Sequence, residues 1–331
     1  MPTAPIRIAI NGFGRIGRTL LRILLRDAPD FELICINEIE ALETCAYLFQ
    51  YDSVFGPWPE EVQAKEGALH VGARRIPFHA APDLSSLDLT GVDIVFECTG
   101  MGGTRAVAER GLSAGASKVL VSGPASEADI TLVIGANEDA LAGHGIVSNA
   151  SCTTNALAPL ARLLDDAYGL VSGHMTTVHC YTGSQPTVDK PRAALERSRA
   201  AALSMVPTTT SAQRLTDLVL PHLAGRIEAR AIRVPTASVS CIDLIIQTER
   251  TVTETAVNTL LQEAAASSSV FGWTTQPLVS SDLRMRPESI VMVGPETSVS
   301  AGGLIRVFGW YDNEWAFSCR MLDMARRMAE S

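Results

Sequence analysis

Near the middle of the chain, residues 148–155 form an octet in which one cysteine is surrounded by small hydroxyl residues. Cys152 lies between a short apolar run, residues 145–147, and apolar residues at helical spacing that continue to Leu164. We therefore expect Cys152 in the first turn of a helix that ends at Gly169. A helix N-terminus favours a thiolate over a thiol, which would make this cysteine a nucleophile. A cysteine is also often a small buried apolar residue, and its position alone does not separate these interpretations.

A thiolate nucleophile needs a base, and His179 is the histidine best placed to be one. It lies in a predicted strand, residues 175–182, beside several threonine hydroxyls. A Cys152–His179 pair across a domain boundary would give a thiolate at neutral pH. A histidine satisfied within a core remains the alternative for His179.

A second stretch with chemical content lies near the start of the chain, where residues 12–17 have the pattern G-x-G-x-x-G. A β-branched run, residues 6–10, precedes it, and a helix over 18–26 and a strand over 31–36 are predicted to follow. Glu38 closes this unit at the spacing of a dinucleotide fingerprint. The glycines let the backbone approach a pyrophosphate, and the acidic residue can bind the ribose hydroxyls. The sequence therefore predicts a dinucleotide site.

Two further predicted strands, residues 93–97 and 118–121, end in small and hydroxyl residues. Ligands bind along the carboxyl edge of a parallel sheet, so Thr99, Gly100 and Ser122 are candidate neighbours of a cofactor. Ordinary loop residues at these three positions are almost as good an interpretation.

After the Cys152 helix, long segments of alternating character predict strands with few intervening helices, at residues 175–182, 228–234, 239–248 and 304–310. The expected class is α/β, with a Rossmann-type dinucleotide-binding domain over 1–150 and an α+β catalytic domain over 151–314. The catalytic domain would hold a mixed, largely antiparallel sheet. A C-terminal helix, 315–331, would pack back on the first domain.

The composition is that of an ordinary globular protein, with 47% hydrophobic residues and a formal net charge of −9 over 331 residues. This charge argues against a general nucleic-acid surface. The seven cysteines are scattered and show no C-x-x-C spacing, so we expect neither a disulfide framework nor a metal site. No stretch has the length of a membrane helix, and no signal-peptide pattern precedes the first strand. We expect a cytoplasmic protein.

With these motifs in hand, the chain resembles the phosphorylating glyceraldehyde-3-phosphate dehydrogenase family over essentially its whole length. The resemblance is carried by several stretches in the order and spacing of that family, at residues 11–18, 148–155, 178–183, 205–210, 233–236, 277–282 and 311–315.

The resemblance implies an NAD-dependent enzyme in which Cys152 is the nucleophile and His179 its base. It implies cofactor contacts at Gly12, Gly14, Arg15, Ile16, Glu38, Ser122 and, for the nicotinamide carboxamide, Asn313. Two anion sites, one for the sugar phosphate and one for inorganic phosphate, would be formed by Ser151, Thr153, Thr182, Thr210, Ser211 and Arg233. It also implies a homotetramer.

Four positions depart from the usual family pattern. Ser184 replaces an acidic residue, Ser211 replaces a glycine, and Phe55 replaces a histidine. Lys190 stands where NAD-using members commonly carry an apolar residue. These departures leave the choice between NAD and NADP open, as well as the choice of substrate.

Two alternative functions remain at this stage. An erythrose-4-phosphate dehydrogenase would share Cys152 and His179 but release its product by hydrolysis, and residues 37–38, 98–100 and 313–315 favour that branch. Residues 181–183 and 208–210 favour the glyceraldehyde branch, and they carry more weight because they line the substrate site. The alternative of another class is a non-catalytic, dinucleotide-binding redox sensor. The presence of an intact set of Cys152, His179, Arg233 and Asn313 argues against it.

Overall fold

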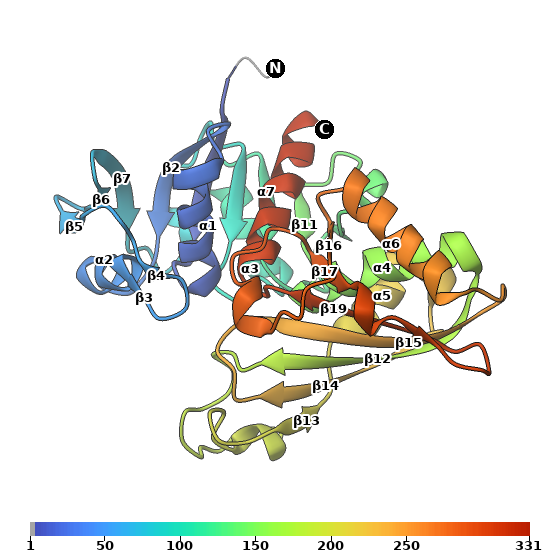
Figure 1. The fold of residues 1–331 in the computed structure, drawn as a ribbon. Coiled ribbons are helices and arrows are strands. Elements are labelled where there is room, and N and C mark those ends of the chain that lie inside the picture. Colours follow the sequence, from blue (N-terminus) through green and yellow to red (C-terminus); the bar gives the residue numbers. More distant parts are fainter. Residues whose placement is uncertain (1–3) are drawn as a thin grey trace. The chain divides into compact units, whose positions relative to one another are not determined.

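The computed structural model describes residues 4–331, so the first three residues of the predicted domain 1–150 lie outside it. The chain forms two compact units. Of the described residues, unit 1 comprises 4–132, Glu138–Ala150 and Ser318–Ser331, and unit 2 comprises Val133–Asn137 and Ser151–Phe317. Each unit is built on a sheet of its own (Figure 1), and the predicted α/β class is confirmed.

The sheet of unit 1 has nine strands in the order β10-β11-β9-β8-β1-β2-β7-β6-β5. All neighbours from β10 to β7 pair in parallel, and β6 and β5 add an antiparallel edge. The strands are β1 (Ile6–Asn11), β2 (Phe31–Asn37), β5 (Val62–Lys65), β6 (Ala68–Val71), β7 (Arg74–His79), β8 (Ile94–Glu97), β9 (Lys118–Val121), β10 (Ile130–Thr131) and β11 (Ile146–Ser148). Because β2 and β8 lie on opposite sides of β1, the chain changes direction there, and open parallel sheets bind ligands at such a point.

The helices of unit 1 are α1 (Arg15–Asp27), α2 (Leu42–Gln50), α3 (Arg105–Ser113) and most of α7 (Trp315–Glu330). Unit 1 also contains two short 3₁₀ turns, η1 (Leu84–Ser86) and η2 (Glu138–Ala140), and a small hairpin of β3 (Tyr51–Asp52) and β4 (Gly56–Pro57). Alternation along β1 gives the sheet two apolar faces. Ala9 packs in one core with Val95 of β8 and Ala108 of α3, while Ile8 and Ile10 point to the other face and are buried there. Helix α1 begins at Arg15, three residues before the predicted start.

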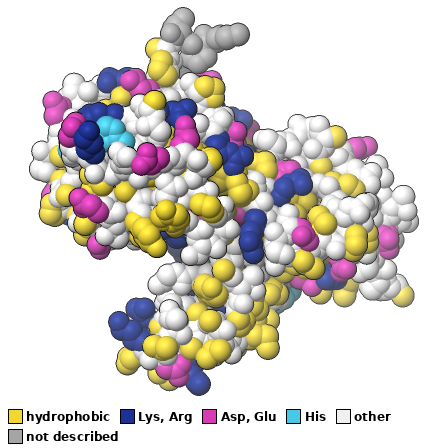
Figure 2. Space-filling model, turned by 60° about the vertical axis from the view of Figure 1, so that its left-hand side comes forward, with side chains coloured by type: hydrophobic (Ala, Val, Ile, Leu, Met, Phe, Trp, Pro, Cys, Tyr) yellow, Lys and Arg dark blue, Asp and Glu magenta, His cyan; other side chains and the backbone are white. Residues whose placement is uncertain are grey.

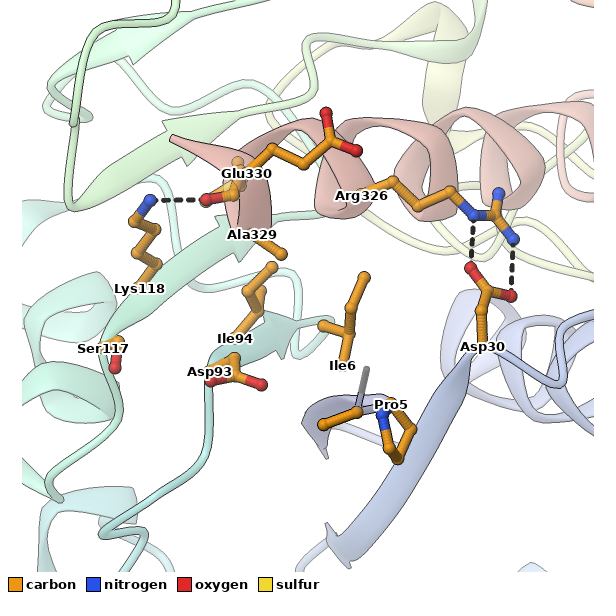
Figure 3. A pocket seen from close by; sticks show the side chains of 12 residues that line it. Pro5, Ile6, Asp30, Asp93, Ile94, Ser117, Lys118, Arg326, Ala329 and Glu330 are labelled. Atoms are coloured by element: carbon orange, nitrogen blue, oxygen red, sulfur yellow. Dashed lines mark hydrogen bonds and ion pairs between the residues drawn. The ribbon is translucent and has the colours of Figure 1, made fainter. Parts of the chain in front are cut away.

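The C-terminal half of α7 is held to the sheet of unit 1 by two polar contacts, which Figure 3 shows. The Arg326 guanidinium donates to both carboxylate oxygens of Asp30, at 2.6 and 3.1 Å. The Lys118 ammonium, at the start of β9, donates to the carbonyl oxygen of Met328. A cavity of about 560 Å³ lies between these groups, at the amino ends of β1, β8 and β9. It therefore lies at the edge opposite the carboxyl ends where cofactor residues were predicted.

The sheet of unit 2 has the order β13-β14-β12-β15-β19-β17-β16, with β18 paired to β19. Its strands are β12 (Leu170–Cys180), β13 (Val206–Thr208), β14 (Ile227–Val234), β15 (Ser240–Thr248), β16 (Phe271–Thr274), β17 (Ile290–Val293), β18 (Ser298–Val299) and β19 (Ile305–Tyr311). Only the β12–β14 and β16–β17 pairs are parallel. The sheet is thus mixed and largely antiparallel, as predicted.

Unit 2 carries three helices, α4 (Cys152–Tyr168), α5 (Ala212–Val219) and α6 (Glu254–Ser267), besides the short turns η3 (Glu196–Ser198), η4 (Pro221–Leu223), η5 (Ser280–Leu283) and η6 (Gly294–Glu296). Helix α4 packs on β12 and β15, and α5 packs on β14. Figure 1 shows α4, α5 and α6 on the same side of this sheet. The expectation of few helices after residue 168 did not identify α5 or α6.

The surface mixes charge and apolar groups. Figure 2 shows a face on which Lys and Arg, Asp and Glu, and hydrophobic side chains are interspersed. Across the part of the chain that the structure describes, no helix has the length and apolar character needed to cross a bilayer.

Candidate active site

Cys152 is the first residue of α4. The Ser151 hydroxyl caps the helix by accepting from the Thr154 amide at 3.1 Å, and Gly169 ends it with a left-handed backbone (φ 71°). The apolar stripe of this helix, from Leu157 to Leu164, is fully buried. The local sequence therefore places Cys152 at a capped helix N-terminus on a rigid, buried element.

His179 lies next to the end of β12, and its Nε2 atom is 3.7 Å from the Sγ of Cys152. Both residues belong to unit 2, so the expectation that this pair spans a domain boundary is wrong. The pair forms inside one unit because α4 packs directly against β12.

The other ring nitrogen of His179, Nδ1, has three polar neighbours, one of which is the Sγ of Cys180 at 3.8 Å. It also lies 2.7 Å from the carbonyl oxygen of Cys180 and 2.7 Å from the Nη1 of Arg233. An arginine only donates, so Nδ1 cannot serve the carbonyl and Arg233 at once. When Nδ1 donates to the carbonyl, the Nε2 lone pair faces Cys152 and can accept its thiol proton.

The electrostatics of this pair differ from the prediction. Burial raises the pKa of the Cys152 thiol, although the Arg233 charge and hydrogen bonds with Thr153 act to lower it. Burial, followed by the Arg233 charge, lowers the pKa of His179 to about 4, against a hydrogen bond to the Cys180 carbonyl. Both shifts favour the uncharged forms, a thiol beside a neutral imidazole. Desolvation therefore opposes the thiolate that the helix N-terminus was predicted to favour.

A buried tyrosine that sequence reasoning did not single out links the elements of this site. The Tyr311 hydroxyl lies 2.8 Å from the Oγ1 of Thr153 on α4 and 2.9 Å from the Oγ1 of Thr177 on β12. Its ring stands edge-on to His179, with centroids 6.1 Å apart. Tyr311 therefore fixes the helix of Cys152 relative to the strand of His179. In the sequence Tyr311 stood out only as the first residue of the family-like stretch 311–315, and the alternation of β19 buries its side chain.

Asn313 follows β19 directly and is 7% exposed. Its Oδ1 accepts from the Sγ of Cys180 at 3.1 Å. This contact joins Asn313, which was predicted to bind the nicotinamide, to Cys180, which follows the predicted base His179.

The predicted anion ligands of unit 2 are only partly assembled. Arg233 contacts His179 and donates to the Cys180 carbonyl at 3.0 Å. The Thr182 hydroxyl lies 2.9 Å from that of Ser184, and the Thr210 hydroxyl accepts from the Ala212 amide. Between residues 4 and 331, no hydrogen bond joins Arg233 to Thr182, Thr210 or Ser211. Ser151 and Thr153 serve α4 and Tyr311, as described above.

In unit 1, the glycine turn and Glu38 lie together. Gly12 has a left-handed backbone (φ 93°), and a Cβ there would come within 2.6 Å of the backbone of Cys98 and Thr99. A Cβ on Gly14 would meet nothing within 4 Å. The Glu38 carboxylate accepts from the Phe13 amide at 2.7 Å and from the Ile39 amide at 2.7 Å. The turn therefore passes tightly against the residues that follow β8 and places an acidic group beside the start of α1.

Four other predicted cofactor residues lie around the same sheet edge. Thr99 follows β8, and its amide and hydroxyl both donate to the buried carboxylate of Glu97, which sequence reasoning missed. Gly100 has a left-handed backbone (φ 77°). The Ser122 amide, after β9, donates to the Glu97 carbonyl at 2.9 Å. Ile16 lies in the first turn of α1.

Arg15 is engaged within unit 1. Its guanidinium forms an ion pair with Asp52, and it lies 5.1 Å from the centre of the Phe55 ring. Phe55, one of the departures from the family pattern, thus stacks on a predicted cofactor residue. Sequence reasoning did not find Asp52, because its pairing depends on the hairpin of β3 and β4.

Comparison with known proteins tests the resemblance. Residues 6–105 match the family profile described as "Glyceraldehyde 3-phosphate dehydrogenase, NAD binding domain", and residues 151–313 match the one described as "Glyceraldehyde 3-phosphate dehydrogenase, C-terminal domain". A glyceraldehyde-3-phosphate dehydrogenase from Xanthobacter flavus is 46% identical over 331 residues, covering 98% of this chain and 99% of the relative.

Two further relatives are similar over comparable lengths. A glyceraldehyde-3-phosphate dehydrogenase from Pseudomonas aeruginosa is 46% identical, and glyceraldehyde-3-phosphate dehydrogenase 1 from Bacillus subtilis is 42% identical. Each alignment covers 98% of both chains. The chain therefore belongs to the glyceraldehyde 3-phosphate dehydrogenase family and is an NAD-dependent oxidoreductase.

Proposed function

We propose that this enzyme oxidises glyceraldehyde 3-phosphate to 1,3-bisphosphoglycerate with NAD and inorganic phosphate. The observation that carries the proposal is the 3.7 Å approach of Cys152 Sγ to His179 Nε2, with Arg233 beside the same histidine. A nucleophile, a base and a cation in one unit suit the attack of sulfur on an aldehyde that carries a phosphate.

The proposed reaction uses Cys152 and His179 twice. The Cys152 proton passes to Nε2 of His179 as the sulfur adds to the aldehyde carbon, and the imidazolium returns it to the carbonyl oxygen, giving a thiohemiacetal. NAD would supply the acceptor for the hydride of that carbon, while Nε2 of His179 takes the hydroxyl proton and Cys152 holds the resulting thioester. An oxygen of inorganic phosphate then attacks the thioester carbon and the carbon–sulfur bond breaks. The acyl phosphate leaves, and the departing sulfur takes the proton from His179, which restores the thiol. Because burial raises the pKa of the Cys152 thiol and lowers that of His179, His179 acts as a base in the first step of this proposal.

Unit 1 fits the dinucleotide half of this proposal. Gly12 lets the backbone turn where a Cβ would clash, and Glu38 presents a carboxylate to which ribose hydroxyls can donate. We propose unit 1 as the NAD-binding domain, with Gly14, Thr99, Gly100 and Ser122 near the cofactor, and unit 2 as the catalytic domain.

Arg233 is the proposed reader of the substrate phosphate. Its planar fork can bind a phosphate through two hydrogen bonds, and phosphate would compete with His179 for the same Nη1. Once Arg233 turns to the phosphate, the Cys180 carbonyl is left as the partner of Nδ1, which favours the tautomer whose Nε2 accepts a proton. Substrate binding would thereby prepare the base.

A panel of two substrates tests the proposal. NADH formation is followed with glyceraldehyde 3-phosphate and with erythrose 4-phosphate, each with and without inorganic phosphate. We expect the three-carbon substrate to be preferred and its turnover to require phosphate. Preferred, phosphate-independent turnover of erythrose 4-phosphate would assign the chain to the erythrose-4-phosphate dehydrogenase branch. No NADH from either aldehyde would favour the redox sensor.

We also propose a homotetramer, which rests on the family. The loop before β13 exposes four large apolar side chains, Val188, Leu195, Leu203 and Met205, each between 73% and 85% exposed. A second copy of the chain would remove such groups from water. Light scattering coupled to gel filtration measures the assembly directly.

A further inference from the structure

Cys180 is a second cysteine close to the catalytic pair, and the proposed reaction does not use its thiol. It follows His179 at the end of β12 and is fully buried. Its Sγ donates to the Oδ1 of Asn313 at 3.1 Å, across the sheet from β12 to the residues that follow β19. The same Sγ also lies 3.8 Å from the Nδ1 of His179, a longer contact than the one with Asn313.

The thiol acts as the donor in this contact. Burial raises the pKa of Cys180 to about 12, with a smaller opposing effect of the Ser240 hydroxyl, so the S–H proton stays in place at neutral pH. The amide group of asparagine has one accepting and one donating side. A donor fixed at Oδ1 therefore turns the Nδ2 of Asn313 away from Cys180.

The backbone of Cys180 is held independently of its side chain. Its amide donates to the Ser240 hydroxyl on β15 at 3.1 Å, and its carbonyl accepts from Arg233. These backbone contacts hold Cys180 in place while its thiol reaches Asn313. Among the residues that the structure describes, Nδ2 of Asn313 makes no hydrogen bond, so it keeps its donor capacity for a ligand.

We propose that Cys180 is a positioning residue that fixes the amide of Asn313 so that Nδ2 donates to the carboxamide oxygen of the nicotinamide ring. This inference rests on the proposed function, in which Asn313 contacts the nicotinamide. Without the thiol, the amide is free to rotate and to present its oxygen to the carboxamide oxygen, which repels it. Cys180 would then act on cofactor binding only through the nicotinamide end.

The test compares two ligands, NAD and ADP-ribose, which lacks the nicotinamide. Cys180→Ala and Cys180→Val both remove the donor, and valine also keeps the volume and suits a strand. We expect each variant to raise the Kd of NAD about 3- to 10-fold, the range of one hydrogen bond, and to leave the Kd of ADP-ribose unchanged. Cys180→Ser keeps a donor and should restore NAD binding to within about 2-fold of the wild type. Cys241→Ala, which truncates another buried thiol on β15, is the matched control and should change neither Kd.

The outcomes separate this inference from the proposed function. Asn313→Ala should weaken NAD and spare ADP-ribose, and an unchanged NAD affinity would overturn both the role of Asn313 and this inference. If Asn313→Ala weakens NAD binding but Cys180→Ala and Cys180→Val do not, the inference about Cys180 is overturned and the role of Asn313 stands. Equal weakening of NAD and ADP-ribose in the Cys180 variants would also overturn it, because a general structural defect would then explain the loss.

Discussion

The Nε2 of His179 lies 3.7 Å from the sulfur of Cys152, on the side of the imidazole opposite the nitrogen that contacts Arg233. The proposed base therefore stands between the proposed nucleophile and a cation. Burial and the nearby charge keep the imidazole neutral, which leaves it able to accept a proton. For the proposed reaction, these pKa shifts favour proton transfer during the attack over an ion pair formed beforehand.

Cys152 should be the first cysteine that an alkylating reagent modifies. Cys98, Cys152 and Cys319 are partly accessible, and of these Cys152 has His179 at hydrogen-bonding distance. Substoichiometric iodoacetamide followed by peptide mass spectrometry should label Cys152 and abolish activity in proportion. Because the thiol pKa is raised, the labelling rate should keep increasing with pH above neutrality.

The histidine makes a separate contribution to the same experiment. His179→Asn should slow labelling of Cys152 near neutral pH and lower kcat/KM by about 10²- to 10⁴-fold, the usual contribution of a general base. Cys319→Ser is the control and should retain activity. Preferential labelling of another cysteine would contradict the assignment of the nucleophile.

The predicted elements hold where local signals are strong. The strand, glycine turn and helix near the N-terminus, and the helix from Cys152 to Tyr168, all form as expected, because caps and glycines mark their ends. Helix α6 was not predicted, because it buries only Val257 and Leu261 and its apolar stripe is weak.

The site was less predictable than the fold. The Tyr311–Thr153 and Cys180–Asn313 contacts join residues 158 and 133 positions apart, and they depend on the pairing of β12, β15 and β19. A sequence does not show that register. The pKa of Cys152 was misjudged because a helix N-terminus can be read from sequence, whereas desolvation of the sulfur cannot.

The buried imidazole should make stability depend on pH. Its pKa is about 4 in the folded chain and about 6.5 when unfolded, so between these values the unfolded chain binds more protons. Stability is therefore lost as pH falls from about 6.5 to 4, by about 3 kcal/mol from this residue. Urea unfolding at pH 7 and at pH 4 should show a smaller loss for His179→Asn than for the wild type. The exposed His79→Asn is the control, and equal losses in all three proteins would refute a buried neutral His179.

Glu38 should decide cofactor preference in favour of NAD. Its carboxylate is held by the amides of Phe13 and Ile39, and its charge would repel the 2′-phosphate of NADP. Lys190 lies on an exposed loop, where it could offset only part of that repulsion. The ratio of kcat/KM for NAD to that for NADP should exceed one, fall in Glu38→Gln and rise in Lys190→Leu. A wild-type preference for NADP would show that the lysine dominates.

Arg233→Ala should lower kcat/KM for glyceraldehyde 3-phosphate by about 10- to 150-fold, because a charge-assisted hydrogen bond is lost. Unphosphorylated glyceraldehyde, assayed with arsenate in place of phosphate, should lose less, since only the contact with His179 is removed for that substrate. Arg233→Lys keeps the positive charge but loses the guanidinium fork, so its kcat/KM for glyceraldehyde 3-phosphate should lie between those of the wild type and Arg233→Ala. Equal losses for both aldehydes would mean that Arg233 does not read the substrate phosphate.

The most direct test of the proposed reaction is a rapid-mixing experiment without inorganic phosphate. Glyceraldehyde 3-phosphate and NAD should give a burst of NADH close to one per active site, and mass spectrometry of the quenched enzyme should find the acyl group on Cys152. Adding phosphate should release that group as an acyl phosphate and restart turnover, while Cys152→Ser should show neither burst nor adduct. Steady NADH formation without phosphate, or a burst with no acyl group on Cys152, would contradict the proposed reaction.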